Sequence, residues 1–282
     1  MAGRAAKLKK RERIGRWLTT LVMVAVACGV ALPFYYIIVN TFKTQEQTTL
    51  SPLGLPTSLN FSNYANVFKT IPVLQSFGNS AYVTVLSVLT MLVVGSMASY
   101  ATIVRKSRFN RRLSVLVVLA LAVPFQSTLV PVYEVFVKLH LVDSLSGLVL
   151  VYSGGAIFCF FLIQGYMAKL PYEIIESARI DGAGPFQCYR RIVLPLSKPI
   201  LVTVGVFQTM WVWNDFLIAN TFLSSPQKDT IVLQVYNSVG QYMTNWPAFM
   251  TLTVLSLIPI TVFFVLMQRH IVSGLLSGAV KG

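Results

Sequence analysis

Long apolar segments alternate with short polar ones along most of this chain. Each apolar segment approaches or exceeds the roughly twenty residues that a helix needs to cross the hydrocarbon core of a bilayer. A helix satisfies its own backbone polar groups, so such segments predict membrane-spanning helices. Six of them occur, at about 17–39, 79–104, 113–136, 147–167, 200–222 and 248–267. The pattern therefore predicts an all-α membrane protein whose six spans form one domain over 17–267.

Some of the expected spans contain residues that shape a helix. Pro124 and Pro131 predict a kink or break in the third span. The adjacent pair Gly154-Gly155 lies at the centre of the fourth. The second span carries a face of small residues that favours close packing against another helix. This face consists of Gly95, Ser96, Ala98 and Ser99.

The segments between the spans are polar. The stretch 40–77 contains three prolines and predicts an external loop with a short interfacial helix near Tyr64 to Phe68. The stretch 224–247 predicts a second external loop, in which SPQKDT is typical of a turn. At the two ends, 1–16 is a basic tail and 268–282 a short C-terminal tail.

Basic residues assign the sides of the membrane. Six spans put both termini on one side, and cytoplasmic loops are the ones enriched in lysine and arginine. The side that holds both termini, the stretch 105–112 and the stretch 169–199 carries 19 of the 23 lysines and arginines. The other side carries Lys43, Lys69, Lys138 and Lys228. Both termini are therefore expected in the cytoplasm.

A basic start followed by an apolar run is also the pattern of a cleaved signal peptide. The sequence Ala25-Val26-Ala27-Cys28 resembles a cleavage or lipid-attachment site. However, the apolar run exceeds the roughly 7–15 residues of a signal core and continues past Cys28. We therefore expect a retained first span.

The composition excludes several classes of protein. Only 11% of the residues are charged, against about 25% in soluble domains. The net charge of +14 could favour nucleic acid, but the positive residues flank the spans, so no nucleic-acid partner is expected. Three cysteines without a CxxC pair and two distant histidines predict neither a disulfide framework nor a metal site.

The polar stretch 169–199 predicts two short helices joined by a glycine turn. Pro171 suits a first helical position, and Gly182 suits the left-handed conformation that ends a helix. Gly184-Pro185 begins the second helix, and Leu194-Pro195 is expected to end it before the fifth span. From these residues alone, a docking element and an ordinary solvated loop are both open.

A family resemblance favours docking. The pattern Glu176-Ser177-Ala178, three residues, Gly182, nine residues, Ile192-Val193-Leu194-Pro195 resembles the "EAA" loop of binding-protein-dependent ABC importer permeases. Ser177 replaces the usual alanine. The tail QRHIVSGLLSGAVKG also resembles the ending of carbohydrate-type permeases, which extends towards the ATPase. Together with the six expected spans, the resemblance covers essentially the whole chain and implies the type I permease fold.

The resemblance implies what the residues do. The coupling residues would be Glu176, Ala178, Arg179, Asp181, Gly182, Ile192, Leu194 and Pro195. The tail contacts to the ATPase would be Gln268, Arg269, Gly274 and Gly278. For Arg179 and Asp181, polar contacts to the partner and simple solvation are both open. Gly182 is the residue on which the loop should depend most, because a side chain there opposes its φ.

The resemblance also implies partners. These are a second homologous permease chain, two ATP-binding subunits and an external solute-binding protein, in a bacterial cytoplasmic membrane. No Walker A sequence occurs on this chain, so ATP and Mg²⁺ would be bound by the partner ATPase. No cofactor and no bond chemistry are expected of this chain itself.

Asp215 is an exceptional ionisable residue within the spans, in the sequence Trp213-Asn214-Asp215. A carboxylate in a membrane marks a functional site by default, and aromatic rings beside Asn and Asp suit a sugar. A similar WNDF motif recurs in carbohydrate permeases, which supports that class. An interfacial aromatic belt or a structural hydrogen bond is the alternative.

The function expected is therefore passage of a sugar or oligosaccharide by alternating access. The same architecture importing glycerol phosphate or a polyol is the alternative. A non-transporting scaffold and a membrane-embedded enzyme are less favoured, since no paired aspartates and no HExxH occur. The scarcity of charged residues within the spans disfavours an ion-coupled transporter.

Overall fold

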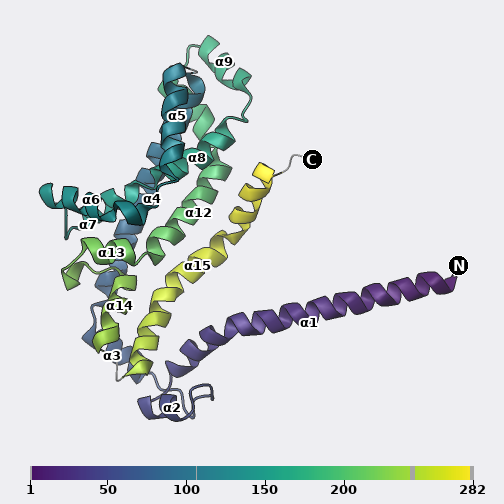
Figure 1. Ribbon diagram of the computed structural model, residues 1–282, viewed down its shortest axis with the longest axis vertical. Helices are drawn as coiled ribbons and strands as arrows, with labels where there is room; N and C mark the ends of the chain where they lie inside the picture. Colours follow the sequence, from purple (N-terminus) through teal and green to yellow (C-terminus); the bar gives the residue numbers. More distant parts are fainter. Residues whose placement is uncertain (1, 106, 242–244, 280–282) are drawn as a thin grey trace. The chain divides into compact units, whose positions relative to one another are not determined.

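The computed structural model describes the backbone of residues 2–105, 107–241 and 245–279, and the side chains within 15–105, 107–239 and 245–269. Throughout these residues the regular structure is helical (Figure 1). The elements are α1 (Ala2–Asn40), α2 (Gln45–Leu50), α3 (Ser62–Thr70), α4 (Val73–Val104), α5 (Arg108–Ala120), α6 (Phe125–Lys138), α7 (Leu145–Ser153), α8 (Ala156–Met167), α9 (Tyr172–Ile180), α10 (Pro185–Cys188), the π-helical turn η1 (Tyr189–Val193), α11 (Leu194–Leu196), α12 (Lys198–Asn214), α13 (Leu217–Phe222), the 3₁₀ turn η2 (Pro226–Lys228), α14 (Ile231–Gln241) and α15 (Trp246–Ala279).

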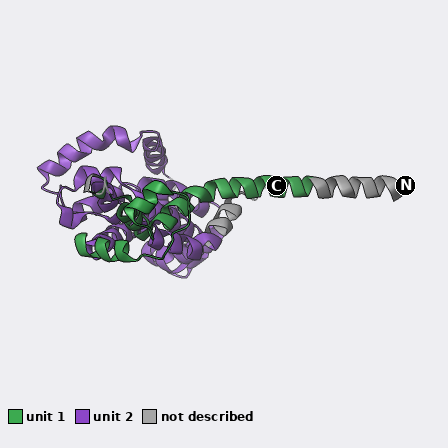
Figure 2. Cartoon of the chain, turned by 90° about the horizontal axis from the view of Figure 1, so that it is seen from below, with its two compact units in different colours: residues 1–71, 238–255 green, residues 72–237, 256–282 purple. Residues whose placement is uncertain are grey.

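The chain divides into two compact units (Figure 2). The first comprises residues 1–71 and 238–255, and the second residues 72–237 and 256–282. In the first unit, Asn63 of α3 donates to the carbonyls of Thr41 and Lys43, at 2.8 and 2.9 Å. These bonds tie the segment directly after α1 to α3, the position at which the sequence predicted a short helix near Tyr64. The second unit contains the long polar loop 169–199.

Four described segments are long and apolar enough to cross a membrane by themselves. They are Gly15–Asn40, Val73–Val104, Leu145–Met167 and Trp246–Arg269. Two bent pairs bring the number to as many as six: α5 with α6, at 102°, and the 185–196 helical run with α12, at 75°. The structure therefore has four to six candidate spans.

Two of the expected spans are not continuous helices. In the stretch 113–136 the helix is interrupted at 121–124, and Pro124 is the N-cap of α6. Pro131 lies inside α6 without a break. In the stretch 200–222 helix α12 ends at Asn214, because Asp215 takes an extended conformation. The sequence signal for the second break was weak, since no proline or glycine lies there.

Helix α4 packs closely on α8 through small side chains. A Cβ atom added at Gly95 would lie 2.7 Å from the Cβ of Cys159. Ser99 donates to the carbonyls of Gly95 and of Phe160, at 2.7 and 3.1 Å. The predicted small-residue face is thus confirmed for Gly95 and Ser99, whereas Ala98 is exposed. Close approach of the backbones holds the second unit together.

Three polar stretches contain more helix than the sequence predicted. Helix α4 begins at Val73 rather than at 79, and α14 lies in the stretch that was expected to be a polar loop. Helix α15 continues through Ala279, past the expected end of the sixth span at 267. Amphipathic and mixed segments such as 231–241 do not stand out in an apolar-run pattern, which explains why α14 was missed.

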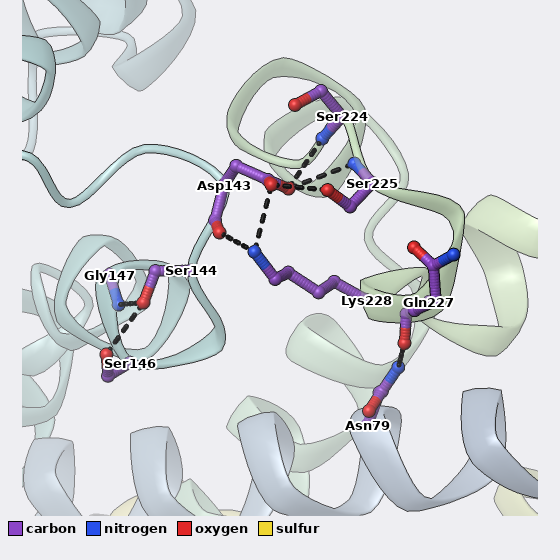
Figure 3. A network of polar contacts seen from close by, with 9 residues as sticks. All are labelled: Asn79, Asp143, Ser144, Ser146, Gly147, Ser224, Ser225, Gln227 and Lys228. Atoms are coloured by element: carbon purple, nitrogen blue, oxygen red, sulfur yellow. Dashed lines mark hydrogen bonds and ion pairs between the residues drawn. The ribbon is translucent and has the colours of Figure 1, made fainter.

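A polar network joins two connecting segments of the second unit (Figure 3). Asp143, between α6 and α7, accepts hydrogen bonds from the backbone N–H groups of Ser224 and Ser225 and pairs with the ammonium of Lys228 at 2.9 Å. Asn79 of α4 donates to the carbonyl of Gln227 at 3.0 Å. The hydroxyl of Ser225 and the Lys228 ammonium hold the pKa of Asp143 well below its usual value.

We predict that Asp143→Asn lowers the free energy of unfolding by about 1 kcal/mol at neutral pH, because it removes the charge that Lys228 and the N–H groups complement. Because the pKa of Asp143 is lower in the folded than in the unfolded chain, its ionised carboxylate stabilises the fold at pH values above the unfolded pKa of about 4. This stabilisation is lost as the pH falls through the folded pKa. Thermal unfolding in detergent should therefore show a constant difference from the native chain above about pH 5, narrowing in more acidic buffer.

Lys69 provides the control, because Lys69→Met removes a cation that is outside this network. Lys228→Met should be destabilising and Lys69→Met neutral. Equal melting temperatures for the Asp143, Lys228 and Lys69 variants would contradict a stabilising role for the network.

Candidate functional site

The first helix of the polar loop ends in a complete C-terminal cap. Helix α9 runs from Tyr172 to Ile180, and Pro171 precedes it as the N-cap, one position earlier than expected. The N–H of Ala183 donates to the carbonyl of Ala178 at 2.9 Å, and the N–H of Gly182 to that of Arg179 at 3.1 Å. This pair of bonds defines a Schellman motif. The φ of Gly182 is +84°, which confirms the left-handed turn.

The second helix of the loop is longer than predicted. Gly184 is the N-cap of α10 and Pro185 its first residue, as expected. The helical run ends at Leu196 and bends at Ser197, one residue past the predicted end at Leu194-Pro195. The π-helical turn η1 precedes Pro195. A wider turn is a common way to accommodate a ring that would clash with the carbonyl four residues earlier.

The loop presents both polar and apolar side chains to its surroundings. Glu176, Arg179 and Asp181 are exposed, whereas Ala178 is buried against the core. Ile180 and Phe186 flank the glycine turn and are 85% and 63% exposed. The sequence analysis missed these two residues, although an apolar side chain on each side of a glycine turn in a polar loop was a usable signal.

Two of the predicted coupling residues, Ile192 and Leu194, are half-buried and pack against the core. Pro195 is exposed. These three residues therefore lie in the part of the loop that joins the helices of the second unit. The exposed residues of the prediction lie at the other end, around the glycine turn.

Two tyrosines attach the loop to α4. The hydroxyl of Tyr100 donates to the carbonyl of Pro185 at 2.8 Å. The hydroxyl of Tyr189 lies 2.8 Å from the hydroxyl of Ser96, and the rings of the two tyrosines lie 5.4 Å apart. The second loop helix is thus fixed to the helix with the small-residue face. Spacing along the chain could not reveal this link, because it joins residues about ninety positions apart.

Asp215 lies at the break between α12 and α13 and binds the start of α13. Its carboxylate Oδ1 accepts hydrogen bonds from the backbone N–H groups of Ile218, at 2.9 Å, and Ala219, at 3.4 Å, and so caps α13. The same oxygen accepts a hydrogen bond from the hydroxyl of Tyr152 at 2.8 Å. The structural role that the sequence left open as an alternative is therefore present.

The three residues predicted for the pathway point to different neighbours. Trp213 donates to the carbonyl of Ser256 of α15 at 3.5 Å and lines a cavity between α4 and α15. Asn214 donates back to the carbonyl of Met210 in its own helix. Trp213, Asn214 and Asp215 thus do not converge on one site.

A different tryptophan lies at an aromatic pocket. Trp211 lines a cavity of about 410 Å³, and its ring meets that of Tyr152 edge-on with centroids 5.6 Å apart. The remaining lining residues are Gly155, Phe158, Phe207 and Gln208. The amide of Gln208 donates to the carbonyl of Gly155 at 3.2 Å. Asp215 therefore acts on this pocket indirectly, by holding Tyr152 against Trp211.

The predicted tail contacts are only partly described. Gln268 and Arg269 are exposed near the end of the described side chains, and Gln268 donates to the carbonyl of Val265. The side chains beyond residue 269 lie outside the described residues, which includes the positions Gly274 and Gly278. Their backbone belongs to α15.

Within the described part of the chain, no group of three His, Cys, Asp or Glu side chains could hold a metal ion. Cys159 and Cys188 are buried, and Cys28 is exposed.

Comparisons with known proteins agree on the class. Residues 91–277 match the model of the family described as "Binding-protein-dependent transport system inner membrane component". The chain is 32% identical over 277 residues to the "Probable starch degradation products transport system permease protein AmyC" of Thermoanaerobacterium thermosulfurigenes, covering 96% of this chain and 99% of that one.

Two solved structures share the fold. One is a bacterial ABC transporter involved in the import of the acidic polysaccharide alginate, with a TM-score of 0.81, 23% identity and coverage of 91% of this chain and 96% of the other. The second is a bacterial alginate ABC transporter in complex with an alginate pentasaccharide-bound periplasmic protein. Its TM-score is 0.63 and its identity 14%, and 90% of this chain and 92% of the other are covered.

We predict that Asp215→Ala lowers the free energy of unfolding by about 2 kcal/mol, because it removes a helix cap and leaves the Tyr152 hydroxyl without its acceptor. Tyr152→Phe should cost about 1 kcal/mol, since it removes a single hydrogen bond and keeps the ring. Asp215→Asn retains an acceptor oxygen and serves as the control. Thermal unfolding in detergent measures all three, and equal stability of the alanine and asparagine variants would refute the capping role.

Proposed function

The chain belongs to the family of binding-protein-dependent transport system inner membrane components, and from this membership we propose that it passes a sugar or oligosaccharide across the bacterial cytoplasmic membrane. It is a permease component and not itself an enzyme. The observation that carries the sugar assignment is the aromatic pocket around Trp211. The names of the similar proteins, which concern starch degradation products and alginate, support it.

The proposed topology has six spans with both termini in the cytoplasm. The spans are those expected from the sequence, with the bent pair α5 and α6 as the third and α12 as the main part of the fifth. The concentration of 19 lysines and arginines on one side supports this orientation. The domain boundaries are accordingly 1–16 for the basic tail, 17–267 for the spans and 268–282 for the C-terminal tail.

The loop 169–199 couples this chain to a separate ATPase, which binds ATP and Mg²⁺. The exposed residues around the glycine turn, namely Glu176, Arg179, Ile180, Asp181 and Phe186, make the contact. Buried apolar anchors surrounded by polar groups are typical of protein interfaces. Closure of the ATPase would displace the turn, and the rigid second helix would carry this displacement into the spans.

The second loop helix is connected to the spans at two places, which would transmit that displacement. Tyr100 and Tyr189 link the second helix to α4, and the bend at Ser197 links it to α12. Both helices supply walls of the cavities described above, so a movement of the loop changes the surfaces along which a solute passes. The tail residues Gln268 and Arg269, with Gly274 and Gly278 beyond them, are proposed as a further contact to the ATPase.

The aromatic pocket suits a sugar in its chemistry. The C–H faces of a pyranose stack on aromatic rings, and its hydroxyls need hydrogen-bond partners such as the amide of Gln208. Phe158, Phe207 and Trp211 are each more than a third exposed, so their rings are available to a solute. No basic side chain is among the described lining residues, which argues against glycerol phosphate as the substrate.

The assembly proposed for transport contains this chain, a second homologous permease chain, two ATP-binding subunits and an external solute-binding protein. The alginate importer solved with its periplasmic binding protein supports this arrangement. The second permease chain would close the open side of the aromatic pocket.

We predict that Gly182→Val abolishes uptake and co-purification of the ATPase while the chain still inserts, because a β-branched residue opposes a φ of +84° and disrupts the cap. Gly182→Asn should retain partial uptake, since asparagine tolerates the left-handed region better than valine does. Uptake of the sugar retained by the cognate binding protein, together with a pull-down, measures both. Native uptake by the valine variant would refute the coupling role of the turn.

We also predict that Trp211→Ala lowers uptake by about tenfold without loss of the ATPase from the purified complex, because it removes a stacking surface worth about 1.4 kcal/mol. Trp213→Ala is the matched control, since Trp213 lines a different cavity. Its uptake should fall less. A larger loss for Trp213→Ala than for Trp211→Ala would place the sugar at the other tryptophan.

A further inference from the structure

Helix α5 has two faces of different character. One face carries Asn110, Leu113, Ser114 and Val117, which line a cavity of about 280 Å³ together with residues of α4 and α8. Ser114 on this face accepts a hydrogen bond from Gln164 of α8 at 3.3 Å. The inner face of α5 is therefore directed towards α4 and α8.

The opposite face is open and changes from basic to apolar along the helix. It carries Arg108, Arg111, Arg112, Val115 and Leu116, which line a concavity of about 550 Å³. Their positions follow the i, i+3, i+4, i+7, i+8 pattern of one helical face. All five side chains are exposed, Val115 at 53% and Leu116 at 64%. One helical turn, about 5 Å of rise, separates the last arginine from the apolar pair.

The basic end of this face is held in place and makes no ion pair with an acidic side chain among the described residues. Ser107 caps the first turn of α5 by accepting from the N–H of Asn110 at 3.0 Å. The side chain of Asn110 donates to the carbonyl of Arg105 at 2.8 Å, which fixes the start of α5 to the end of α4. Among the described residues, the ion pair within 4 Å joins Lys228 to Asp143 and involves none of these arginines.

A basic turn followed directly by an apolar turn matches an amphiphile with an anionic head and an acyl chain. Guanidinium groups bind phosphate oxygens in a bidentate manner, and basic pockets at the cytoplasmic side of membrane helices bind anionic headgroups. The exposed aliphatic side chains then contact hydrocarbon. A soluble partner would satisfy the arginines but would leave Val115 and Leu116 in water.

We propose that Arg108, Arg111 and Arg112 bind the phosphate of an anionic phospholipid whose acyl chain lies along Val115 and Leu116. The proposal rests on the cytoplasmic orientation of the α5 N-terminus proposed above. It does not depend on the sugar pathway or on the coupling loop.

The test uses the full-length chain purified with its partner chains in mild detergent. Dioleoylphosphatidylglycerol or dioleoylphosphatidylcholine is added, and native mass spectrometry counts the lipids retained. The native complex should retain the phosphatidylglycerol preferentially. Each arginine changed to glutamine should weaken that preference by about fivefold, and R108Q/R111Q/R112Q should retain both lipids equally.

Three controls separate the possible results. K7Q/K9Q/K10Q removes the same charge from the N-terminal tail and should leave the preference unchanged. R108K/R111K/R112K keeps the charge, and hence the membrane orientation, and should give an intermediate preference. Leu116→Ser should weaken lipid retention. Added inorganic phosphate should displace no lipid from this variant, as from the native complex.

Several outcomes would overturn the proposal. These are a native complex without preference for phosphatidylglycerol, a preference that survives the triple glutamine variant, and displacement of the lipid by millimolar inorganic phosphate, which would indicate a free-anion site. Loss of a partner chain from the triple glutamine variant, with lipid retention unchanged, would assign this face to a protein contact. Because lipid retention is read without transport, it stays interpretable even if the proposed uptake fails.

Discussion

A backbone group that loses its helical partner inside a bilayer has no water to replace it, and this constraint governs the second unit. The chain interrupts its helices at several points, and polar side chains or carbonyls meet the interrupted ends. The carboxylate of Asp215 receives the first N–H groups of α13. The carbonyl of Phe222, at the other end of α13, accepts from the N–H of Asp143 at 2.7 Å. The amide of Gln208 reaches the carbonyl of Gly155, where α7 gives way to α8. At each of these breaks, a polar group of a neighbouring segment thus supplies a hydrogen-bond partner for the helix end.

Helices α4 and α8 also approach each other closely. Because Gly95 has no side chain, the backbones of α4 and α8 lie close together at Cys159, and Ser99 can reach a carbonyl of α8. The same helix α4 meets the polar loop through Tyr100 and Tyr189. A bulky residue at Gly95 would therefore separate α8 and also shift the surface to which the loop is attached. The packing of α8 and the attachment of the polar loop thus depend on one helix, which gives a physical reason for the small residues in it.

The sequence alone accounts for the apolar segments, the left-handed turn at Gly182 and the helix that begins at Pro185, because each depends on neighbours along the chain. The break at Asp215 was not predictable in the same way. A carboxylate within an apolar run is compatible with a pathway, a belt or a cap, and only the hydrogen bonds from the N–H groups of Ile218 and Ala219 identify the cap. Trp211 and Trp213 are two residues apart in one helix, so the sequence could not tell which of them borders the aromatic pocket. Tyr100 and Tyr189 were missed for a similar reason, since their contact joins distant segments.

The arrangement separates rigid parts from exposed ones in a way that suits transmission of movement. Around Gly182 the loop exposes Ile180 and Phe186, whereas Cys188 and Val193 further along are buried. A force applied at the exposed end acts on a helical run that is anchored by hydrogen bonds at its start and by packing along its length. Because bending the run would expose buried apolar surface, we expect it to move as a body together with α4, to which Tyr100 holds its start. The run meets α12 at the bend at Ser197, at an angle of 75°. Under the coupling proposed above, movement of the loop reaches α12, which carries Trp211, and Asp215 directly after its end.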